Sequence, residues 1–392
     1  MKAGDFEIAG TTGNAGAALP GSPPRRVWLE ISLGTLTGNY RKIREAVAPA
    51  EVIAVLKADA YGLGVLPIAE ALIEAGVERF GVAEPHEAMR LLPLGKRVQI
   101  LSSVLPEEIA PMVGAGVTLP VTDLATAERI SAEATRQGRA ATVHFKIDTG
   151  MGRLGILAAE AAGIIRAAHR LPGLNCEGIF SHFPCAYDAE SDLTHRQIGT
   201  FCALLDALAA DNITFAKIHI ANSDAINNFP RASRAPFNAI RAGINLHGSF
   251  DTAGKRTLRV APVLTLKTRL TAIRDLPQGT GIGYGHTCRL ARATRVGVIS
   301  AGYADGLPLA LSNRGHVLIR GVPCPVLGRV SMDYTSVSLE HAPHAQVGDE
   351  AVCLGGAGAH AVTVEDWAAI KQTHAYDIIC SFGNRVERRF VG

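Results

Sequence analysis

The sequence predicts a parallel (β/α)8 TIM barrel followed by a C-terminal, mostly antiparallel β domain. From Val27 onwards, short runs rich in β-branched residues alternate with longer amphipathic stretches, as in successive βα units. After about Arg259 the helical period disappears, and short alternating runs broken by Gly and Pro follow, which is typical of a small antiparallel β domain. We therefore expect a barrel over residues 27–258 and a β domain over residues 259–392, with the first strand able to pair with the C-terminal domain.

The barrel elements follow from the apolar periodicity. After an initial strand at 27–31, eight runs are expected to form the barrel strands: 52–56, 80–83, 99–101, 117–120, 142–147, 176–180, 217–220 and 239–240. Helical patterns lie between most of them, at 36–47, 67–74, 124–137, 158–169 and 193–210. The β domain is expected to contain strands at 264–269, 294–299, 316–319, 325–327, 335–337 and 350–354.

Composition excludes several classes of protein. A net charge of +3 with no basic run gives no sign of nucleic-acid binding. Residues 1–26 are rich in Gly, Ala, Thr and Pro and read as a flexible extension; Asp5 and Glu7 interrupt any secretory apolar core. No apolar window is long enough to span a membrane. The seven scattered cysteines, without a C-x-x-C pair, fit reduced cytoplasmic thiols better than disulfides or a zinc site, so we expect no bound metal.

The segment EVIAVLKADAYGLG places Lys57 at the C-terminal end of a buried strand, four residues before Tyr61. Barrel enzymes present catalytic groups at this end of their strands, where a lysine amine can hold an aldehyde cofactor as a Schiff base. Taken alone, the pattern also fits a lysine that simply leaves a strand for solvent.

Further polar residues follow the later strands of the predicted barrel. These are Lys146, Asp148, Met151 and Arg153, then Ser181 and His182, then His219, Asn222 and Ser223, and finally Arg241, Gly243 and Gly248. Each group alone fits a structural histidine, a packed methionine or a turn glycine. Together they fall on one face of the barrel. The glycines and Ser223 could present N–H groups to a phosphate, which with the strand-end lysine suggests pyridoxal 5'-phosphate (PLP).

Eight motifs occur in order along the chain: AVLKADAYGLG, KIDTGMGRLG, SHF, ANSDA, IRAGINLHG, GYGHT, GYADG and GRVSMDY. On these motifs the chain resembles the alanine racemases, fold-type III PLP enzymes, over roughly residues 27–392. The resemblance implies a PLP-binding barrel, a C-terminal β domain, an amino-acid substrate and a head-to-tail homodimer with shared active sites. It also implies interconversion of L-alanine and D-alanine, supplying D-alanine for peptidoglycan, with catabolism of one enantiomer as the alternative role.

The resemblance assigns the catalytic roles. Lys57 would carry PLP and act on one face of the substrate, while Tyr284 of a partner subunit would act on the opposite face. Racemisation needs two such groups because a proton leaves one side of Cα and arrives at the other. Arg241 would face the pyridine nitrogen and, being only a donor, would keep it unprotonated. The ring would then be a weaker electron sink, which limits side reactions such as transamination.

The same resemblance assigns the binding residues. Arg153 and the Met332 backbone would bind the substrate carboxylate, and His182 would contact the cofactor ring. The implied phosphate ligands are Tyr61, Ser223, Gly243 and Ile244.

Three supporting positions have a second interpretation. Lys146 matches a lysine that many relatives carry as a carbamate, and otherwise reads as a lysine paired with Asp148. Tyr303 and Asp333 match residues lining the substrate entrance, and otherwise read as a packed aromatic residue and a turn cap.

Two positions depart from the family pattern. His247 stands where tyrosine is common, and Asn384 stands about where some members have a phosphate-contacting tyrosine.

Three rival functions stay open: a broad-specificity amino-acid racemase, a fold-type III decarboxylase and a PLP-binding carrier protein. Arg241 argues against the decarboxylase, whose pyridine nitrogen faces an acidic residue, and the segment after residue 259 argues against the single-barrel carrier.

Overall fold

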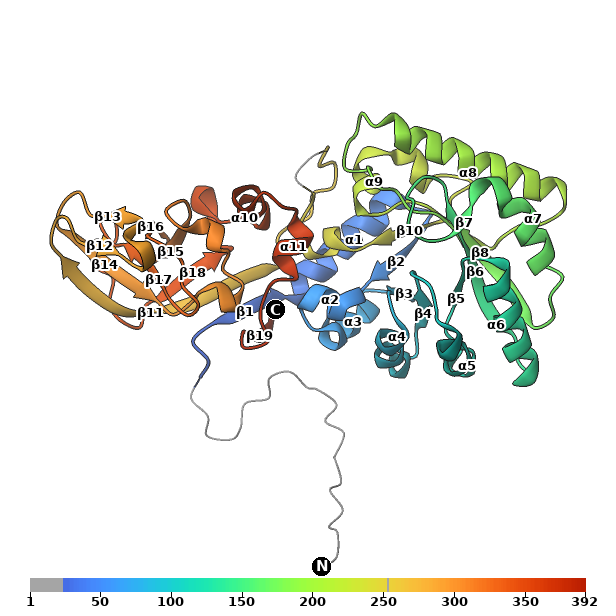
Figure 1. Ribbon diagram of the computed structural model, residues 1–392, viewed down its shortest axis with the longest axis horizontal. Helices are drawn as coiled ribbons and strands as arrows, with labels where there is room; N and C mark the ends of the chain where they lie inside the picture. Colours follow the sequence, from blue (N-terminus) through green and yellow to red (C-terminus); the bar gives the residue numbers. More distant parts are fainter. Residues whose placement is uncertain (1–23, 252–253) are drawn as a thin grey trace, which may run out of the picture. The chain divides into compact units, whose positions relative to one another are not determined.

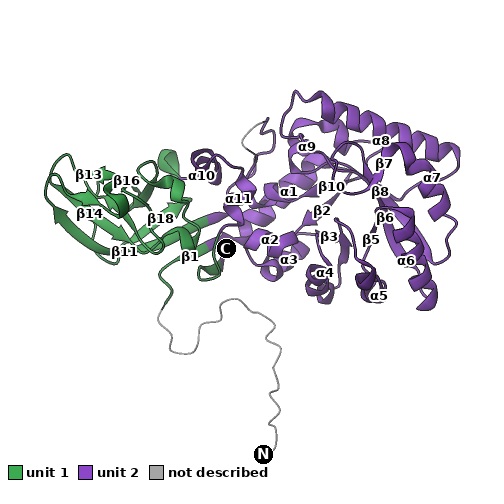
Figure 2. Cartoon of the chain, viewed as in Figure 1, with its two compact units in different colours: residues 1–29, 265–361, 382–389 green, residues 30–264, 362–381, 390–392 purple. Residues whose placement is uncertain are grey.

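The computed structural model describes residues 24–251 and 254–392, so most of the extension expected over 1–26 lies outside the described residues. The chain forms two compact units, coloured separately in Figure 2. The barrel unit contains residues 30–264, 362–381 and 390–392. The β unit contains the described residues up to 29, together with 265–361 and 382–389.

Eight parallel strands form the barrel, which confirms the predicted fold class (Figure 1). They are β2 (Glu51–Val55), β3 (Arg79–Val82), β4 (Arg97–Ile100), β5 (Leu119–Val121), β6 (Ala141–Asp148), β8 (Leu174–Phe180), β9 (Lys217–His219) and β10 (Ala239–Ala242). Their hydrogen-bonded order is β4-β3-β2-β10-β9-β8-β6-β5. A parallel bridge between Gln99 and Thr118 links the two ends of this order, so the barrel is nearly closed. A short strand, β7 (Ile156–Leu157), adds to β6.

Helices follow most of the barrel strands, as expected for βα units. They are α1 (Leu33–Val47), α2 (Lys57–Gly62), α3 (Val65–Glu74), α4 (Pro85–Leu91), α5 (Pro106–Ala115), α6 (Leu124–Arg136), α7 (Ala158–Ala168), α8 (Asp192–Ala210) and α9 (Ser223–Asn228). Side-chain caps fix several starts: Ser32 accepts from the Thr35 N–H, and Asp123 accepts from the Thr126 N–H.

Alternation along β6 shows how the strands supply the interior of the barrel. Val143, Phe145 and Ile147 are buried apolar residues, whereas His144 and Lys146 between them are buried polar residues. Successive side chains of a strand point to opposite faces. Because Lys146 lines a cavity inside the barrel unit, the even-numbered positions of β6 face the interior.

The β unit is built on an eight-stranded sheet with the order β14-β17-β16-β15-β18-β11-β1-β19 and an additional β14–β11 pairing. The strands are β1 (Trp28–Ser32), β11 (Leu264–Leu276), β14 (Thr294–Ile299), β15 (His316–Ile319), β16 (Val322–Leu327), β17 (Thr335–Ser338), β18 (Glu350–Leu354) and β19 (Glu387–Val391). A separate hairpin joins β12 (Gly281–Ile282) to β13 (Cys288–Arg289). Strand β11 has a register shift between Leu270 and Ala272, and a β-bulge of this kind bends a strand. It can therefore pair with β18 through its first half and with β14 through its second, which gives a barrel-like sheet.

Two helices lie in the part of the chain where the sequence showed no helical period. They are α10 (Val364–Lys371) and α11 (Ala375–Ile379), and both belong to the barrel unit. Segments of eight and five residues are too short to display a 3.6-residue repeat, which explains why periodicity did not predict them. No helix within 24–251 and 254–392 combines the length and apolarity needed to cross a membrane.

Candidate active site

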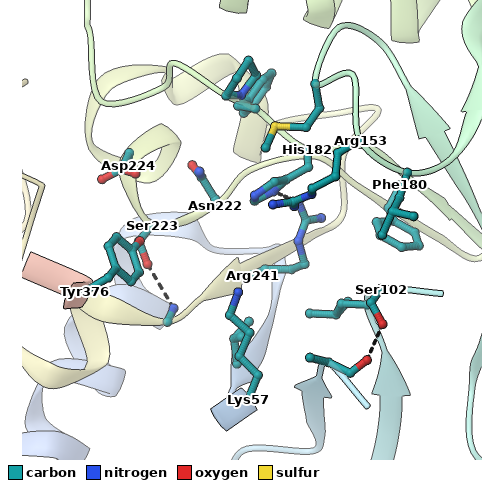
Figure 3. Close-up of a pocket in the computed structure, with 18 of the residues that line it drawn as sticks. Lys57, Ser102, Arg153, Phe180, His182, Asn222, Ser223, Asp224, Arg241 and Tyr376 are labelled. Carbon is teal, nitrogen blue, oxygen red and sulfur yellow. Dashed lines mark hydrogen bonds between the residues drawn. The ribbon is translucent and has the colours of Figure 1, made fainter. Parts of the chain in front are cut away.

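A cavity of about 670 Å³ lies within the barrel unit (Figure 3). Residues at or just beyond the ends of the barrel strands line it, together with residues of the α11 region. The structure brings eight of the predicted site residues to this cavity: Lys57, Tyr61, Lys146, Arg153, His182, Ser223, Arg241 and Gly243. Ile244 follows Gly243 at the start of the 3-10 turn Ile244–His247 and is buried, but it is not among the lining residues.

The backbone immediately after Lys57 is left-handed. Ala58, Asp59, Ala60 and Tyr61 all have φ between 53° and 63°. L-residues avoid this region because Cβ approaches the following carbonyl oxygen. Two hydrogen bonds to residues beyond the turn hold it in place. The Glu87 carboxylate accepts from the backbone N–H of Ala58 at 2.5 Å, and Asp59 Oδ1 accepts from the Val65 N–H at 3.0 Å.

The environment of Lys57 favours the uncharged amine. Burial, and after it the charge of Arg153, lowers the pKa of Lys57. A lysine whose pKa is lowered by burial is a better nucleophile and proton acceptor at neutral pH. In Figure 3 its amine points toward Arg241 inside the cavity.

Arg241, on β10, is almost fully buried, and both its terminal nitrogens have protein partners. Nη1 donates to His219 Nδ1 at 2.7 Å, and Nη2 donates to the Ser181 carbonyl at 2.7 Å, to the Ile220 carbonyl at 3.0 Å and to His182 Nδ1 at 3.2 Å. Burial lowers the pKa of Arg241 to about 9. Among the described residues, no acceptor uses Nε–H, so this donor remains for a group in the cavity.

Two segments that follow neighbouring strands, one with Ser223 and one with Gly243, meet next to Arg241. Ser223 Oγ accepts from the Gly243 N–H at 3.0 Å, and both residues line the cavity. A Cβ at position 243 would lie 2.2 Å from Tyr61 Oη, so only glycine lets the tyrosine hydroxyl approach this backbone. Hydroxyl and backbone N–H donors around a close-approach glycine are what a phosphate group requires. The residues present therefore fit the phosphate of PLP.

Lys146 and Asp148 do not form the pair that one interpretation predicted. Lys146 Nζ donates to the Leu101 carbonyl at 2.6 Å, and Asp148 accepts instead from the backbone N–H groups of residues 150–153. Burial, followed by the charges of Arg241 and Arg153, lowers the pKa of Lys146 to about 8. Burial works to raise the pKa of Asp148, but the four backbone donors outweigh it, and the pKa is lowered. Asp148 therefore shapes the turn that carries Arg153.

His182 is half-buried beside Arg241. Burial, and after it the charge of Arg241, holds the pKa of His182 well below its usual value. Its ring is therefore neutral at pH 7, and Nδ1 can accept from the guanidinium. A neutral ring in this position can lie against an aromatic cofactor without adding a charge.

The sequence interpretation missed Tyr376, which lies on α11 and lines the cavity. Its ring centroid lies 5.9 Å from that of Tyr61, and Figure 3 draws its side chain among those that line the cavity. Asn384 belongs to the β unit and is not among the lining residues, so its position was not the relevant one. Tyr376, and not the residue at position 384, is therefore the tyrosine of the C-terminal segment that lines this cavity. The only sequence feature that could have indicated this residue was the tyrosine in the segment AYDII.

His247, the other departure from the family pattern, packs behind Tyr61. The two rings meet edge to face with their centroids 5.1 Å apart. Burial lowers the pKa of His247 to about 4, so the ring is neutral and acts here as a packing group. His247 is not among the residues that line the cavity.

The remaining predicted residues lie in the β unit. Tyr284, in the 3-10 turn Tyr284–His286, is 71% exposed, and Met332 and Tyr303 are also exposed. Asp333 is held by Arg385, whose Nη1 donates to it at 2.7 Å. Arg385 also forms a two-pronged contact with the buried Asp305, at 2.7 and 2.8 Å.

Those contacts join two loops of the β unit. The Met332 carbonyl accepts from Arg385 Nη2 at 3.2 Å, while Asp305 accepts from the Gly302 N–H at 2.9 Å. The Ser331 carbonyl accepts from the Tyr303 N–H at 3.0 Å, and the Met332 carbonyl accepts from the Ala304 N–H at 3.2 Å. Arg385 therefore fixes the loop that carries Met332 and Asp333 against the loop that carries Tyr303.

Comparisons with known proteins agree along almost the whole chain. The family model "Alanine racemase, N-terminal domain" matches residues 31–250, and "Alanine racemase, C-terminal domain" matches residues 263–390. An alanine racemase of Desulforamulus reducens is 38% identical over 93% of this chain and 99% of its own length. One from Halothermothrix orenii is 36% identical over 93% of this chain and 97% of its own length.

Solved structures give the same family. The alanine racemase of the D-cycloserine producer Streptomyces lavendulae has a TM-score of 0.86 at 32% identity, covering 95% of this chain and 98% of its own. The Bartonella henselae alanine racemase, solved with covalently bound pyridoxal phosphate, has a TM-score of 0.84 at 27% identity, covering 94% and 100%. On the two family matches and these relatives, the chain belongs to the alanine racemase family.

Proposed function

We propose that two copies of this chain form an alanine racemase that interconverts L-alanine and D-alanine with PLP, in the cytoplasm. The observation that carries the proposal is the convergence, in one cavity, of Lys57, the Arg241 guanidinium and the hydrogen-bonded pair Ser223 and Gly243. Family membership supports the activity, the cofactor and a role in supplying D-alanine for peptidoglycan. The seven free cysteines support a reducing compartment.

PLP, when bound, supplies the electron sink that makes the Cα proton of an amino acid acidic. We assign Lys57 as the residue that holds it covalently and Arg241 as the donor facing its ring nitrogen. Tyr61, Ser223, Gly243 and Ile244 would hold its phosphate, with Tyr376 added from its place in the cavity. His182 would lie against the ring region through its neutral imidazole.

Proton transfer is assigned to Lys57 on one face of Cα and to Tyr284 of the partner subunit on the other. The 71% exposure of Tyr284 supports a phenol that serves a second molecule, because a large aromatic residue in a monomer is usually more buried. Lys57 Nζ takes or returns the proton on its face while the phenol oxygen does the opposite on its own face. A monomer would lack one of the two groups.

The substrate carboxylate is assigned to Arg153 and to the backbone N–H of Met332 from the partner. Arg153 is placed by the backbone turn around Asp148. Lys146, whose pKa is lowered to about 8, has enough neutral amine to add CO2 and form a carbamate with release of a proton. That anion would orient Arg153, and Tyr303 and Asp333 would line the approach.

The first test measures D-alanine formation and exchange of the Cα proton in D2O on a panel of L-amino acids, with PLP present. Racemisation of alanine far above serine and lysine is expected. Equal rates across the panel would indicate a broad-specificity racemase, and decarboxylation or no turnover would refute the proposal.

The second test addresses the shared site. Lys57→Ala and Tyr284→Phe chains are each expected to be inactive alone, and mixing them should restore about a quarter of the wild-type activity per subunit if chains pair at random. Random pairing makes half of the dimers mixed, and each mixed dimer has one intact site. Verified mixed dimers without activity would show that Tyr284 does not act across the interface.

A further inference from the structure

The buried guanidinium of Arg241 has no carboxylate among its hydrogen-bond partners within the described residues. Those partners are two histidine rings and the main-chain carbonyls of residues 181, 219 and 220. A buried charge is costly unless it is compensated. The first group that compensates the buried charge of Arg241 is His219, whose Nδ1 accepts from Arg241 Nη1 at 2.7 Å.

A chain of hydrogen bonds runs from Arg241 through the interior of the barrel to Glu177 on β8. His219 Nε2 lies 3.2 Å from His144 Nδ1, and His144 Nε2 lies 2.9 Å from Glu177 Oε2. Arg79 holds this carboxylate with both terminal nitrogens, at 2.9 and 3.0 Å. Glu177 is not among the residues that line the cavity.

Arg241 and Glu177, at the two ends of this series of hydrogen bonds, determine which ring nitrogen carries the proton in each histidine. Arginine can only donate, so His219 Nδ1 is an acceptor and the ring proton is on Nε2. That proton is donated to His144 Nδ1, and the proton on His144 Nε2 is donated to Glu177. The Gln99 amide, which donates to His144 Nδ1 at 3.0 Å, agrees with this assignment. Burial lowers the pKa of both histidines, so both rings are neutral.

The two imidazoles therefore point the same way. Each presents a lone pair toward Arg241 and an N–H toward Glu177, so their dipoles stabilise the positive charge at one end and the negative charge at the other. This arrangement compensates Arg241 without a carboxylate beside it. A direct carboxylate would draw the guanidinium away from the cavity and weaken the donor that remains on Nε.

Packing fixes the two rings in this orientation. The His219 ring is stacked on Phe180, with centroids 4.9 Å apart and an angle of 7°. A Cβ at position 178 would lie 2.6 Å from the His144 ring, so Gly178 leaves the space in which that ring lies. The series of hydrogen bonds from Arg241 to Glu177 is thus held in place by the packing of the barrel interior.

We propose that His219, His144 and Glu177 are positioning residues that hold Arg241 as a fixed cationic donor toward the cofactor nitrogen. The proposal rests on the proposed function. Glu177 acts on the Arg241 guanidinium, which it does not contact, through the two neutral histidine rings between them. Weakening it loosens Arg241, and the cofactor nitrogen then gains a proton more easily, which favours transamination over racemisation.

The test uses the PLP-loaded enzyme with Glu177→Gln, which keeps the shape and an acceptor for His144 but removes the charge. Three readouts are followed: kcat, the transamination events per racemisation, and the ¹⁵N chemical shift of labelled pyridine nitrogen. A fall in kcat of about tenfold, which corresponds to ~1.4 kcal/mol, is expected. An unchanged KM, a rise in the transamination fraction and a shift of the nitrogen signal toward the protonated form should accompany it.

The matched control is Glu51→Gln. Glu51 also pairs with Arg79, and with Lys217, but it makes no hydrogen bond to either histidine. It should leave the ¹⁵N signal and the transamination fraction at wild-type values. His219→Phe, which keeps an aromatic ring against Phe180 but cuts the chain at Arg241, should give the same changes as Glu177→Gln in larger measure.

The outcomes separate the two proposals. If wild-type enzyme racemises alanine and Glu177→Gln matches Glu51→Gln in nitrogen signal and transamination fraction, the positioning role is wrong and the proposed function stands. If wild-type enzyme with PLP does not racemise alanine, the proposed function fails first. Should His219→Phe not fold, the spectroscopic comparison of the two glutamate variants still decides.

Discussion

Alanine at position 243 would place a methyl group 2.2 Å from Tyr61 Oη, whereas ordinary contact begins at 3.4 Å. One of the two groups must therefore move by about 1.2 Å. The backbone at 243 has a negative φ of −125°, outside the left-handed region that favours glycine, so the prediction for Gly243→Ala rests on the contact with Tyr61. Tyr61 has little room to move, because its buried ring lies against His247 and Tyr376.

Overpacking of this kind costs about 1 to 3 kcal/mol. If the strain is released by displacing Tyr61 from the proposed phosphate site, the Kd for PLP should rise about 5- to 150-fold, since each 1.4 kcal/mol is tenfold. Titration of the apoenzyme with PLP, followed by absorbance, measures this directly. Gly199→Ala on α8 is the control, because a Cβ there meets nothing within 4 Å, and it should bind PLP as the wild type does.

A double-mutant cycle with Tyr61→Phe identifies the cause. Removing the hydroxyl leaves the ring carbon Cζ at 3.2 Å as the nearest atom, so most of the overlap disappears. The double variant should therefore lose less affinity than the product of the two single losses. An unchanged Kd in Gly243→Ala, or losses that simply multiply, would refute the steric reasoning.

Two further predictions concern the supporting residues. Arg385→Lys replaces the two-pronged contact with Asp305 by a single point charge, so the loop carrying Met332 should loosen. Steady-state kinetics should show KM for alanine raised about threefold to tenfold with PLP affinity unchanged, and an unchanged KM would contradict the role of this loop. For Lys146, the native-state pKa of about 8 lies below the ordinary 10.5, so the unfolded chain binds more protons between these values and stability rises with pH there. In CO2-free buffer the free energy of unfolding should rise more from pH 8 to 10.5 in wild type than in Lys146→Met, and parallel curves would show that Lys146 is not responsible.

The sequence predicted the barrel well because its strands are short apolar runs separated by helical patterns, and local periodicity is enough to find them. Each of the eight expected runs overlaps a strand in the barrel order. The motifs also identified Lys57 and Arg241, since both stand at strand ends, where the fold places reactive groups.

Features that depend on register and on distant partners could not be predicted. The contact between His144 and His219 exists because β6, β8 and β9 are paired in one particular register, which periodicity does not specify. Tyr376 was missed for a different reason: it lies on a five-residue helix, too short to carry a period, in a segment expected to be β structure. The left-handed turn after Lys57 has no glycine at its first four positions, so the local sequence does not predict left-handed backbone there.

That turn inverts a familiar preference. In an ordinary helix alanine is more stable than glycine by about 1 kcal/mol, but left-handed backbone costs an L-residue about 1 to 2 kcal/mol. At Ala58 and Ala60, therefore, glycine is the residue that the backbone favours, and alanine is the strained one. A design procedure that treated residues 57–62 as a helix would rank substitutions there in reverse. The strand-end lysine is thus carried by a segment that is stabilised by contacts to residues beyond it, Glu87 and the Val65 N–H at the start of α3.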